Sequence, residues 1–435
     1  MYKRQLVDHI YVVPGNGGTA NLEKVTNIDS IKQDDFATLV RFAKEKSVNL
    51  VVPGPEAPLV AGIVDYFQKH GEHSIRCFGP SQAAARMEGS KTFSKDFMRK
   101  HGIPTATYQN FSDYEQAKKY LDMISHNVVI KASGLAAGKG VIIPQTKEEA
   151  QDALKEIMLD KEFGAAGDEV VIEEFLEGDE LSILSFSDGE TIKSLPPAQD
   201  HKRIGEGDTG PNTGGMGTYA PTRIAPPDVI EQIHKNILQP TIDGMRQDSF
   251  MFKGVLFTGL MMTKSGAKVL EYNVRFGDPE TQSLLALMES DLAEVMIACV
   301  EGRLGEADVT VSDKSAATVV VAAGGYPGSY AKGTAMTLDS VPEGELAWLI
   351  SHSFHLLTHL RVKNVSLTDI DVVLFHAGTS FIDNTLKTSG GRVIASTAIG
   401  TTLEEAVTRA YKGVECIHFD NMQYRKDIAG RALKK

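Results

Sequence analysis

The sequence predicts a protein built from several α/β and α+β domains. A chain of 435 residues is too long for one ordinary hydrophobic core, so two to four domains are expected. In the N-terminal part, short apolar runs alternate with helical patterns, which is typical of a parallel sheet covered by helices. Near the C-terminus, strand-like runs at 318–323, 371–377 and 391–395 precede a helix at 402–417, which indicates a small antiparallel unit.

Composition narrows the class of protein. A hydrophobic content of 42% and a charged content of 23% are those of a soluble globular chain. The net charge of −12 argues against nucleic acid as a partner. Cys77, Cys299 and Cys416 form neither a disulfide framework nor a zinc motif, which favours reduced thiols and a cytoplasmic location. We expect no membrane span and see no signal-peptide core.

The N-terminus departs from an ordinary protein start. Met1–Gln5 reads MYKRQ, which is also the translation of a common transposon-derived sequencing adapter. A strand is predicted almost at once, at 10–13, and it runs into the turn 14–18. We therefore expect the first five residues not to be native and the true N-terminus to be missing.

Alternating elements continue to residue 100. Turns at 14–18 and 53–56 follow predicted strands, and ligands of parallel sheets bind at the carboxyl ends of strands. These turns are therefore a candidate site, although plain turns explain them equally well. Lys91 falls inside a predicted helix, where a lone lysine usually faces solvent. We expect helices over 34–44, 59–69 and 81–100, the last capped by Ser81, and strands over 50–52 and 76–78.

A glycine-rich hairpin is the first sign of a phosphate ligand. The run 128–142, VVIKASGLAAGKGVI, contains a β-branched strand that ends at Lys131, a Gly/Ala loop that carries Lys139, and a return to apolar residues. Glycines let backbone N–H groups approach an anion, and lysines supply charge. Because the loop returns into a strand instead of opening a helix, it is not a P-loop. On its own, such a loop is weak support for a phosphate ligand.

Two further stretches suggest a nucleotide and a functional loop. After a helix at 147–160, the strand 169–174 ends in acids and Phe-Leu, which suits an adenine at an edge strand, with Glu180 on the ribose hydroxyls; an ordinary strand end is the alternative. After a strand at 181–187, the run 196–218 contains a DHKR cluster and little regular pattern. Loops of that length inside a domain are usually functional, and a linker is the less favoured alternative because linkers are seldom this mixed in charge.

The most specific polar pattern follows a helix at 227–247 and strands at 254–263 and 268–274. On a strand the side-chain period is two, so Glu271, Asn273 and Arg275 share one face. A carboxylate and an amide oxygen suit Mg²⁺, and an arginine suits a carboxylate or phosphate. The opposite, buried face is expected to carry Leu270, Tyr272 and Val274.

Taken together, these segments resemble glycinamide ribonucleotide synthetase (phosphoribosylamine–glycine ligase), an ATP-grasp family of purine biosynthesis. PNTGGMG and NVRFGDPE distinguish this family from other ATP-grasp ligases such as biotin carboxylases. The resemblance is greatest to the eukaryotic form. The similar stretches lie in family order at 14–20, 51–63, 78–81, 89–98, 129–141, 173–182, 196–221 and 270–282.

The resemblance implies three domains. A parallel α/β domain (pre-ATP-grasp) is expected at 1–90, an ATP-grasp core at 91–312 with a lid at about 109–178, and a small C-terminal domain at 313–425 that closes the active site. The family opens with a strand and a GxGGREHA-type loop that helps bind the phosphoribosyl group, and nothing here matches them. We therefore expect the N-terminal domain to lack its first, central strand, leaving unpaired backbone groups and an apolar slot.

The implied reaction is the ATP-dependent ligation of glycine to 5-phosphoribosylamine through glycyl phosphate. Its products are glycinamide ribonucleotide, ADP and phosphate, and its implied cofactors are ATP and Mg²⁺ or Mn²⁺. Fusion to, or association with, other purine-biosynthesis enzymes is also implied. Two alternatives stay open, namely a catalytically incomplete nucleotide-binding fragment and another ATP-grasp carboxylate–amine ligase.

The resemblance also assigns roles to residues, with the loop 134–140 closing over the nucleotide. His376 is expected to be structural, and 390–392 a weak candidate for substrate contact. The implied catalytic residues are Arg275, Lys131 and Asp200, and the metal ligands are Glu271 and Asn273. The implied ATP-binding residues are Lys91, Lys131, Ser133, Gly138, Lys139, Gly140, Glu173, Glu174, Phe175, Leu176 and Glu180. The implied substrate residues are Pro55, Asp200, Lys202, Asn212, Thr213, Gly214, Arg275, Gly277 and Asp278.

Overall fold

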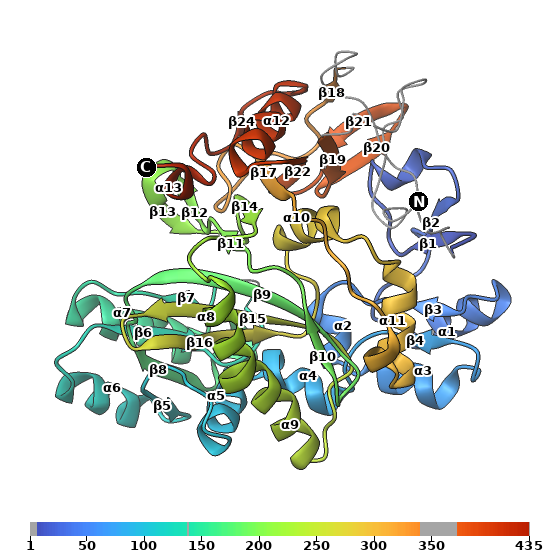
Figure 1. The fold of residues 1–435 in the computed structure, drawn as a ribbon. Coiled ribbons are helices and arrows are strands. Elements are labelled where there is room, and N and C mark those ends of the chain that lie inside the picture. The colour runs from blue at the N-terminus through green and yellow to red at the C-terminus, as the bar shows by residue number, and fades with distance from the viewer. Residues whose placement is uncertain (1–6, 137–138, 340–371, 435) are drawn as a thin grey trace.

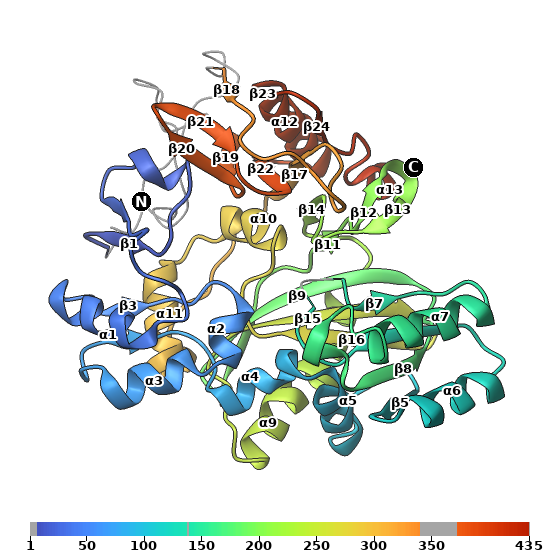
Figure 2. The same ribbon diagram turned by 180° about the vertical axis from the view of Figure 1, so that it is seen from behind.

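The computed structural model describes residues 7–136, 139–339 and 372–434. Figure 1 shows a lower body of two β-sheets with their helices, an upper C-terminal unit, and the N-terminal elements along one side. Figure 2 shows from behind that β1 and β2 lie next to the C-terminal unit. In the described part of the chain, no helix has the length and apolar character needed to cross a membrane.

The N-terminal part contains the expected alternation of strands and helices. The strands pair in parallel as β1 with β2 and β3 with β4. No ladder joins β1 to β3 among the described residues, and an apolar cavity of about 180 Å³ lies between them, lined by residues such as Tyr11, Phe42, Leu50 and Phe67. The elements are β1 Ile10–Val12, β2 Val25–Asn27, α1 Phe36–Glu45, β3 Leu50–Val51, α2 Glu56–Val60, α3 Ile63–His70 and β4 Arg76–Cys77.

Two helices expected to be continuous are each broken. The helix predicted at 59–69 is interrupted at Gly62, whose φ of +89° belongs to the left-handed region that favours glycine. The helix predicted at 81–100 divides into α4 (Gln82–Gly89) and α5 (Lys91–Lys100). Ser90 is extended, and its Oγ accepts a hydrogen bond from the backbone N–H of Phe93, which caps α5. After this break Lys91 is the first residue of α5, and its side chain is half-buried.

The body contains two four-stranded sheets. The first has the order β5-β8-β6-β7, so β8 is central and the expectation that it is an edge strand is wrong. The expected hairpin is confirmed, because β6 pairs antiparallel with β7. Helices α6 and α7 cover this sheet with a hydrophobic cluster of their own. The elements are β5 Tyr108–Phe111, α6 Tyr114–Met123, β6 Val128–Ala132, β7 Val141–Ile142, α7 Lys147–Met158 and β8 Val170–Glu174.

The second sheet has the order β10-β9-β15-β16 and is antiparallel throughout. Its buried face packs on α4, α5 and a long helical segment in which a π turn at His234–Leu238 joins α8 to α9. The elements are β9 Asp179–Ser187, β10 Ile192–Ser194, α8 Pro227–Ile233, α9 Gln239–Gln247, β15 Gly254–Thr263 and β16 Gly266–Asn273.

The C-terminal sheet takes strands from the segment 196–218, which corrects the expectation of a loop without regular structure. Within it, β11 and β14 join the sheet of order β11-β14-β17-β22-β19, while β12 and β13 form a separate hairpin. The elements are β11 Gln199–Asp200, β12 Arg203–Gly205, β13 Thr209–Asn212, β14 Gly217–Ala220, α10 Glu280–Leu287, α11 Leu292–Glu301, β17 Ser315–Ala323, β18 Met336–Leu338, β19 Val372–His376, β20 Thr379–Ile382, β21 Thr385–Thr388, β22 Arg392–Gly400, α12 Leu403–Glu415, β23 Ile417–Phe419, β24 Met422–Gln423 and α13 Gly430–Leu433.

A buried histidine fastens the C-terminal tail to the segment before the β12–β13 hairpin. Nε2 of His201 accepts a hydrogen bond from the backbone N–H of Ala429 at 3.2 Å, and Nδ1 lies 3.2 Å from the carbonyl oxygen of Gly217. Burial lowers the pKa of His201 from 6.5 to about 4. The folded state therefore holds a neutral imidazole at neutral pH.

His201 predicts a loss of stability on acidification. Between pH 6.5 and about 4, the unfolded chain binds a proton that the folded chain does not, so stability falls as pH falls through this window. From pH 7 to 5 the loss at this residue is about 2 kcal/mol. We expect His201→Gln, which keeps an acceptor near Ala429, to remove that share of the pH dependence in urea unfolding.

The control for this prediction is His73→Gln on an exposed loop, which should leave the pH dependence unchanged. His376 is also buried, and burial lowers its pKa to about 4. Its contribution to the pH dependence of stability is therefore present in every variant. Equal pH dependence in the wild type and His201→Gln would contradict the role given to His201.

Candidate active site

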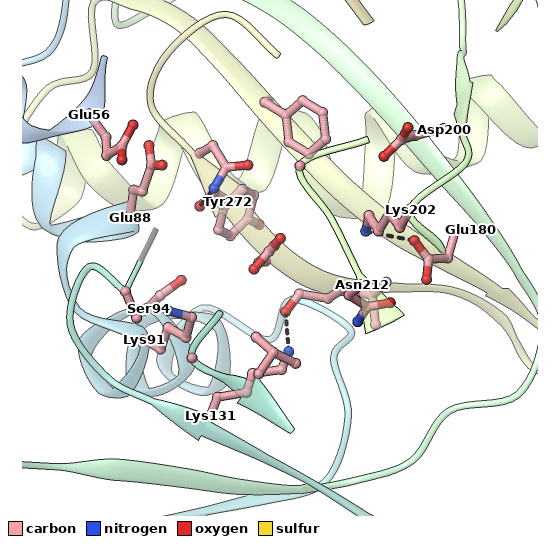
Figure 3. Close-up of a pocket in the computed structure, with 18 of the residues that line it drawn as sticks. Glu56, Glu88, Lys91, Ser94, Lys131, Glu180, Asp200, Lys202, Asn212 and Tyr272 are labelled. Atoms are coloured by element: carbon pink, nitrogen blue, oxygen red, sulfur yellow. Dashed lines mark hydrogen bonds and ion pairs between the residues drawn. The ribbon is translucent and has the colours of Figure 1, made fainter. Parts of the chain in front are cut away.

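A cavity of about 670 Å³ lies between the two sheets of the body. Figure 3 shows its polar side chains, with Glu56 and Glu88 together at one end and Asp200, Lys202 and Glu180 at the other. The cavity brings together eighteen of the residues expected from the sequence: Pro55, Lys91, Lys131, Gly140, Glu173, Glu174, Phe175, Leu176, Glu180, Asp200, Lys202, Asn212, Thr213, Gly214, Glu271, Asn273, Arg275 and Asp278.

Three of the expected residues that the structure describes are not in its wall. Ser133 is buried behind α5, where its Oγ lies 3.0 Å from that of Thr92, and Lys139 is exposed. Gly277 is buried against Phe257. Gly138 lies outside the described residues, as do the first five residues of the chain.

Cationic groups reach the cavity from four separate elements. Lys91 begins α5, and Nζ donates a hydrogen bond to the carbonyl oxygen of Gly134 at 3.3 Å. Lys131 lies on β6, and Lys202 and Arg275 follow β11 and β16. Burial lowers the pKa of Lys91. Such a convergence of positive charge suits a polyanionic ligand.

Lys202 shows how these charges are balanced. Nζ lies 2.6 Å from a carboxylate oxygen of Glu180. Burial acts to lower the pKa of Lys202, but Glu180, Glu271 and Asp200 more than offset it, so the pKa is raised. The residue therefore stays charged at neutral pH.

Glu271 and Asn273 fit a divalent cation. Burial acts to raise the pKa of Glu271, but Lys202, Lys131, Lys91 and Arg275 lower it overall, so this carboxylate is ionised. The Asn273 amide donates to the carbonyl oxygen of Tyr272 at 3.1 Å, which leaves its oxygen as an acceptor. Among the described residues, no group of three acidic, His or Cys side chains could hold a metal. One carboxylate and one amide oxygen match Mg²⁺, which takes its other ligands from phosphates and water.

The strand that carries these two residues differs from the expected pattern. A register shift opposite Gly259 and Leu260 leaves Leu270 outside the regular pairing. Leu270 therefore packs with Leu176 and Met261, instead of with Tyr272 and Val274 in the main core. The prediction that Leu270 is buried on that core face is therefore wrong. The strand also ends one residue earlier than predicted, because β16 ends at Asn273.

Arg275 is held by two glutamates: Glu56, in the turn 53–56 that the sequence marks as a candidate site, and Glu88, which was not expected there. Its guanidinium lies 3.6 Å from Glu56 and 3.5 Å from Glu88. Glu88 also accepts a hydrogen bond from the backbone N–H of Val274 at 2.6 Å, and burial raises its pKa to about 7. Glu56 belongs to the Pro-Gly-Pro-Glu turn, so its position at a strand end was a usable signal. Nothing local distinguishes Glu88 from an ordinary helical glutamate.

Two buried acids lie at the far end of the cavity. Burial and the neighbouring charge of Glu280 raise the pKa of Asp200, and burial raises the pKa of Glu280. Ser182 donates a hydrogen bond to Glu280 at 3.1 Å, and the backbone N–H of His201 donates to Asp200 at 2.7 Å. Carboxyl groups of raised pKa suit an amine ligand. They can accept hydrogen bonds from its N–H groups and then accept one of its protons.

Arg392, in the segment considered a weak candidate, ties the C-terminal unit to the cavity. Its guanidinium donates to the carbonyl oxygens of Gly214 and Asp278, each at 2.8 Å, and pairs with the Asp278 carboxylate at 2.7 Å. The backbone N–H of Gly214 donates to the hydroxyl of Tyr326 at 3.1 Å. A Cβ on Gly214 would meet the Arg392 guanidinium at 3.0 Å, so a larger residue there would push the guanidinium back by a few tenths of an ångström.

Comparisons with known proteins fit this arrangement. Three models of phosphoribosylglycinamide synthetase match the chain in order, namely the N domain over 1–88, the ATP-grasp (A) domain over 89–281 and the C domain over 316–431. A phosphoribosylamine–glycine ligase of Vibrio cholerae is 43% identical over 430 residues, covering 99% of this chain and 94% of the relative. The chain belongs to the phosphoribosylamine–glycine ligase family. Its ATP-grasp domain implies ATP and a divalent cation.

One further relative and two solved structures are also similar to this chain. A bifunctional purine biosynthetic protein of Schizosaccharomyces pombe is 55% identical over 98% of the chain, which spans 51% of that relative. The crystal structure of a Thermotoga maritima phosphoribosylamine–glycine ligase has a TM-score of 0.78 at 33% identity and covers 97% of this chain and 94% of its own. A biotin carboxylase domain from Hydrogenobacter thermophilus has a TM-score of 0.69 at 15% identity, covers 96% of this chain and 86% of its own, and shares the fold.

The Arg392 contacts predict a local effect of one substitution. Arg392→Met should free the segment 213–216 from the C-terminal unit and increase its amide hydrogen exchange, because the hydrogen bonds from the guanidinium to the carbonyl oxygens of Gly214 and Gly215 are lost together with its two contacts to Asp278. Arg99→Met, an exposed arginine on α5, is the control for a general loss of stability. Unchanged exchange in Arg392→Met would contradict this role.

Proposed function

We propose that this chain joins glycine to 5-phosphoribosylamine at the expense of ATP, giving glycinamide ribonucleotide, ADP and phosphate. The observation that carries the proposal is the convergence of Lys131, Glu271, Arg275 and Asp200 on one cavity. These residues come from the motifs that define the family in the sequence. The chain spans about half the length of its bifunctional relatives, and the reaction proposed is that of the ligase half alone.

ATP is proposed to lie along the side of the cavity formed by α5, β6 and β8. Leu176, Met261 and Leu270 offer an apolar surface for the adenine, and Glu180 an acceptor for the ribose hydroxyls. Lys91 and Lys131 would contact the phosphates. The other proposed wall residues for the nucleotide are Gly140, Glu174 and Phe175, while Glu173 acts through Lys131, with which it is paired.

Glu271 and Asn273 would hold Mg²⁺, or Mn²⁺ in its place, which neutralises phosphate charge when bound. In the first step a carboxylate oxygen of glycine attacks the γ-phosphorus of ATP, and the bond to the β-phosphate oxygen breaks. Both reactants are anions, so positive charge near the transferring group should be the largest catalytic contribution. Arg275, held by Glu56 and Glu88, would supply it without moving.

In the second step the amine of phosphoribosylamine attacks the acyl carbon of glycyl phosphate. The carbon–oxygen bond to phosphate breaks, and the amine loses a proton. Asp200, with Glu280 beside it, would accept that proton, since burial has raised its pKa. Pro55, Lys202, Asn212, Thr213, Gly214 and Asp278 complete the proposed substrate end of the cavity.

The proposal also covers the domain boundaries, the cellular compartment and fusion to a second enzyme. The boundaries 1–90, 91–312 and 313–425 are supported by the succession of the three family models. The separate hydrophobic cluster of α6 and α7 supports a lid at about 109–178. Buried, unpaired Cys77, Cys299 and Cys416 support a reducing, cytoplasmic compartment. Fusion to a second purine-biosynthesis enzyme is supported by the bifunctional relatives.

The test is ADP release by the purified chain with Mg-ATP, glycine and freshly generated phosphoribosylamine, each omitted in turn. We expect ADP only when all three are present. ATP binding without glycine-dependent turnover would favour the incomplete-fragment alternative. Turnover with a different carboxylate or amine would favour another ATP-grasp ligase.

The metal assignment gives a separate prediction. Glu271→Gln removes the one carboxylate of the proposed metal site, so we expect kcat/KM for Mg-ATP to fall by about 100-fold, with a higher Mg²⁺ requirement. Asn273→Ala should act in the same direction. Glu45→Gln, an exposed glutamate on α1, is the control. Wild-type activity in a folded Glu271→Gln variant would remove the assignment.

A further inference from the structure

Lys95 is a buried lysine to which the proposed reaction gives no task. It lies one helical turn after Lys91 on α5, and four-residue spacing places both on the same helix face. Its side chain is 3% exposed, which is rare for a lysine without a specific partner. Nζ donates a hydrogen bond to Oγ1 of Thr105 at 2.7 Å, and Thr105 in turn donates to the carbonyl oxygen of Val269 at 2.7 Å.

The main partner of Lys95 is Glu173, which it shares with Lys131. Glu173 lies on β8 between β5 and β6, and its side chain is 2% exposed. One carboxylate oxygen is 2.5 Å from Nζ of Lys131, and the other forms an ion pair with Nζ of Lys95. Figure 3 shows Lys131 on the same side of the cavity as Lys91 and Ser94, which belong to α5.

The charge of this triad decides what Lys131 can do. Lys131 and Glu173 alone would form a neutral buried pair, and a buried pair gives up its partner only at a large cost. Lys95 adds one positive charge, so the triad is cationic overall and its carboxylate is divided between two ammonium groups. Nζ of Lys131 has a further contact only with the carbonyl oxygen of Leu270, at 3.2 Å, among those the structure describes.

We propose that Lys95 is a positioning residue for ATP: by sharing Glu173, it leaves the Lys131 ammonium group able to bind the nucleotide phosphates. This inference rests on the proposed function, since it assigns Lys131 to ATP. Burial lowers the pKa of Lys95 to about 8, with Glu173 opposing the change, so the residue is charged at neutral pH. Burial acts to raise the pKa of Glu173, but Lys131 and Lys95 lower it overall, so the carboxylate stays ionised.

A purely structural role makes a different prediction. If Lys95 only neutralises Glu173, its loss should lower stability and leave the affinity of the folded protein for ATP unchanged. If it frees Lys131, its loss should weaken ATP binding, and removing the carboxylate as well should restore it. The double substitution therefore separates the two accounts.

The experiment measures ATP affinity by calorimetric titration with Mg-ATP in the absence of glycine and phosphoribosylamine, together with thermal unfolding. We expect Lys95→Met to raise Kd for ATP about tenfold, the effect of one charge-assisted contact. Lys95→Met combined with Glu173→Gln should return to within about threefold of the wild type, and Lys95→Arg should stay within that range. In turnover, Lys95→Met should raise KM for ATP more than it lowers kcat.

Lys100→Met, at the exposed end of the same helix, is the matched control. An unchanged Kd in folded Lys95→Met, or no recovery in the double variant, would overturn the inference. Should Lys95→Met fail to fold, the double variant alone decides, because weak ATP binding there contradicts the account. A wild type that binds ATP but does not ligate would refute the proposed function and leave this test intact.

Discussion

The carboxylate of Glu271, surrounded by Lys91, Lys131, Lys202 and Arg275, is the electrostatic centre on which the arrangement depends. Each cation comes from a different element, and charges leave water at a large cost unless they meet partners. The two sheets of the body, the break before α5 and the turn after β16 must therefore converge for the charges to balance. Folding and formation of the cavity are one event in this view, and the four cations around Glu271 are the groups that a polyanionic ligand would meet.

The outer units complete the cavity from both sides. Glu56, from the N-terminal part, helps to hold Arg275, and Arg392, from the C-terminal sheet, holds the turn at Asp278 and the segment at Gly214. His201 and the tail residue Ala429 tie the same segment to the end of the chain. Residues far apart in sequence thus fix the end of the cavity proposed for the substrates, while the side proposed for the nucleotide is built within the body.

Much of this could be predicted from the sequence, because strand and helix periods and cap residues are local. The hairpin at 128–142, the strand at 254–263 and the helix at 402–417 were expected with nearly their observed bounds. The wrong predictions fall where residues distant in the sequence determine the local structure. The segment 196–218 becomes strands because β17 offers a free edge to β14, and β8 is central because β5 pairs beside it. Glu88 and Lys95 read as ordinary helical residues until the fold buries them against Arg275 and Glu173.

The central claim is that one cavity activates a carboxylate as an acyl phosphate and then transfers it to an amine. The most direct test uses glycine labelled with ¹⁸O in its carboxylate, together with Mg-ATP and phosphoribosylamine. Attack of the carboxylate on the γ-phosphorus makes a carboxylate oxygen bridge carbon and phosphorus, and the later break leaves that oxygen on phosphate. The account predicts one ¹⁸O atom in each phosphate released, by mass spectrometry. Unlabelled phosphate formed with full ligation would contradict it, because the carboxylate would then not have been phosphorylated.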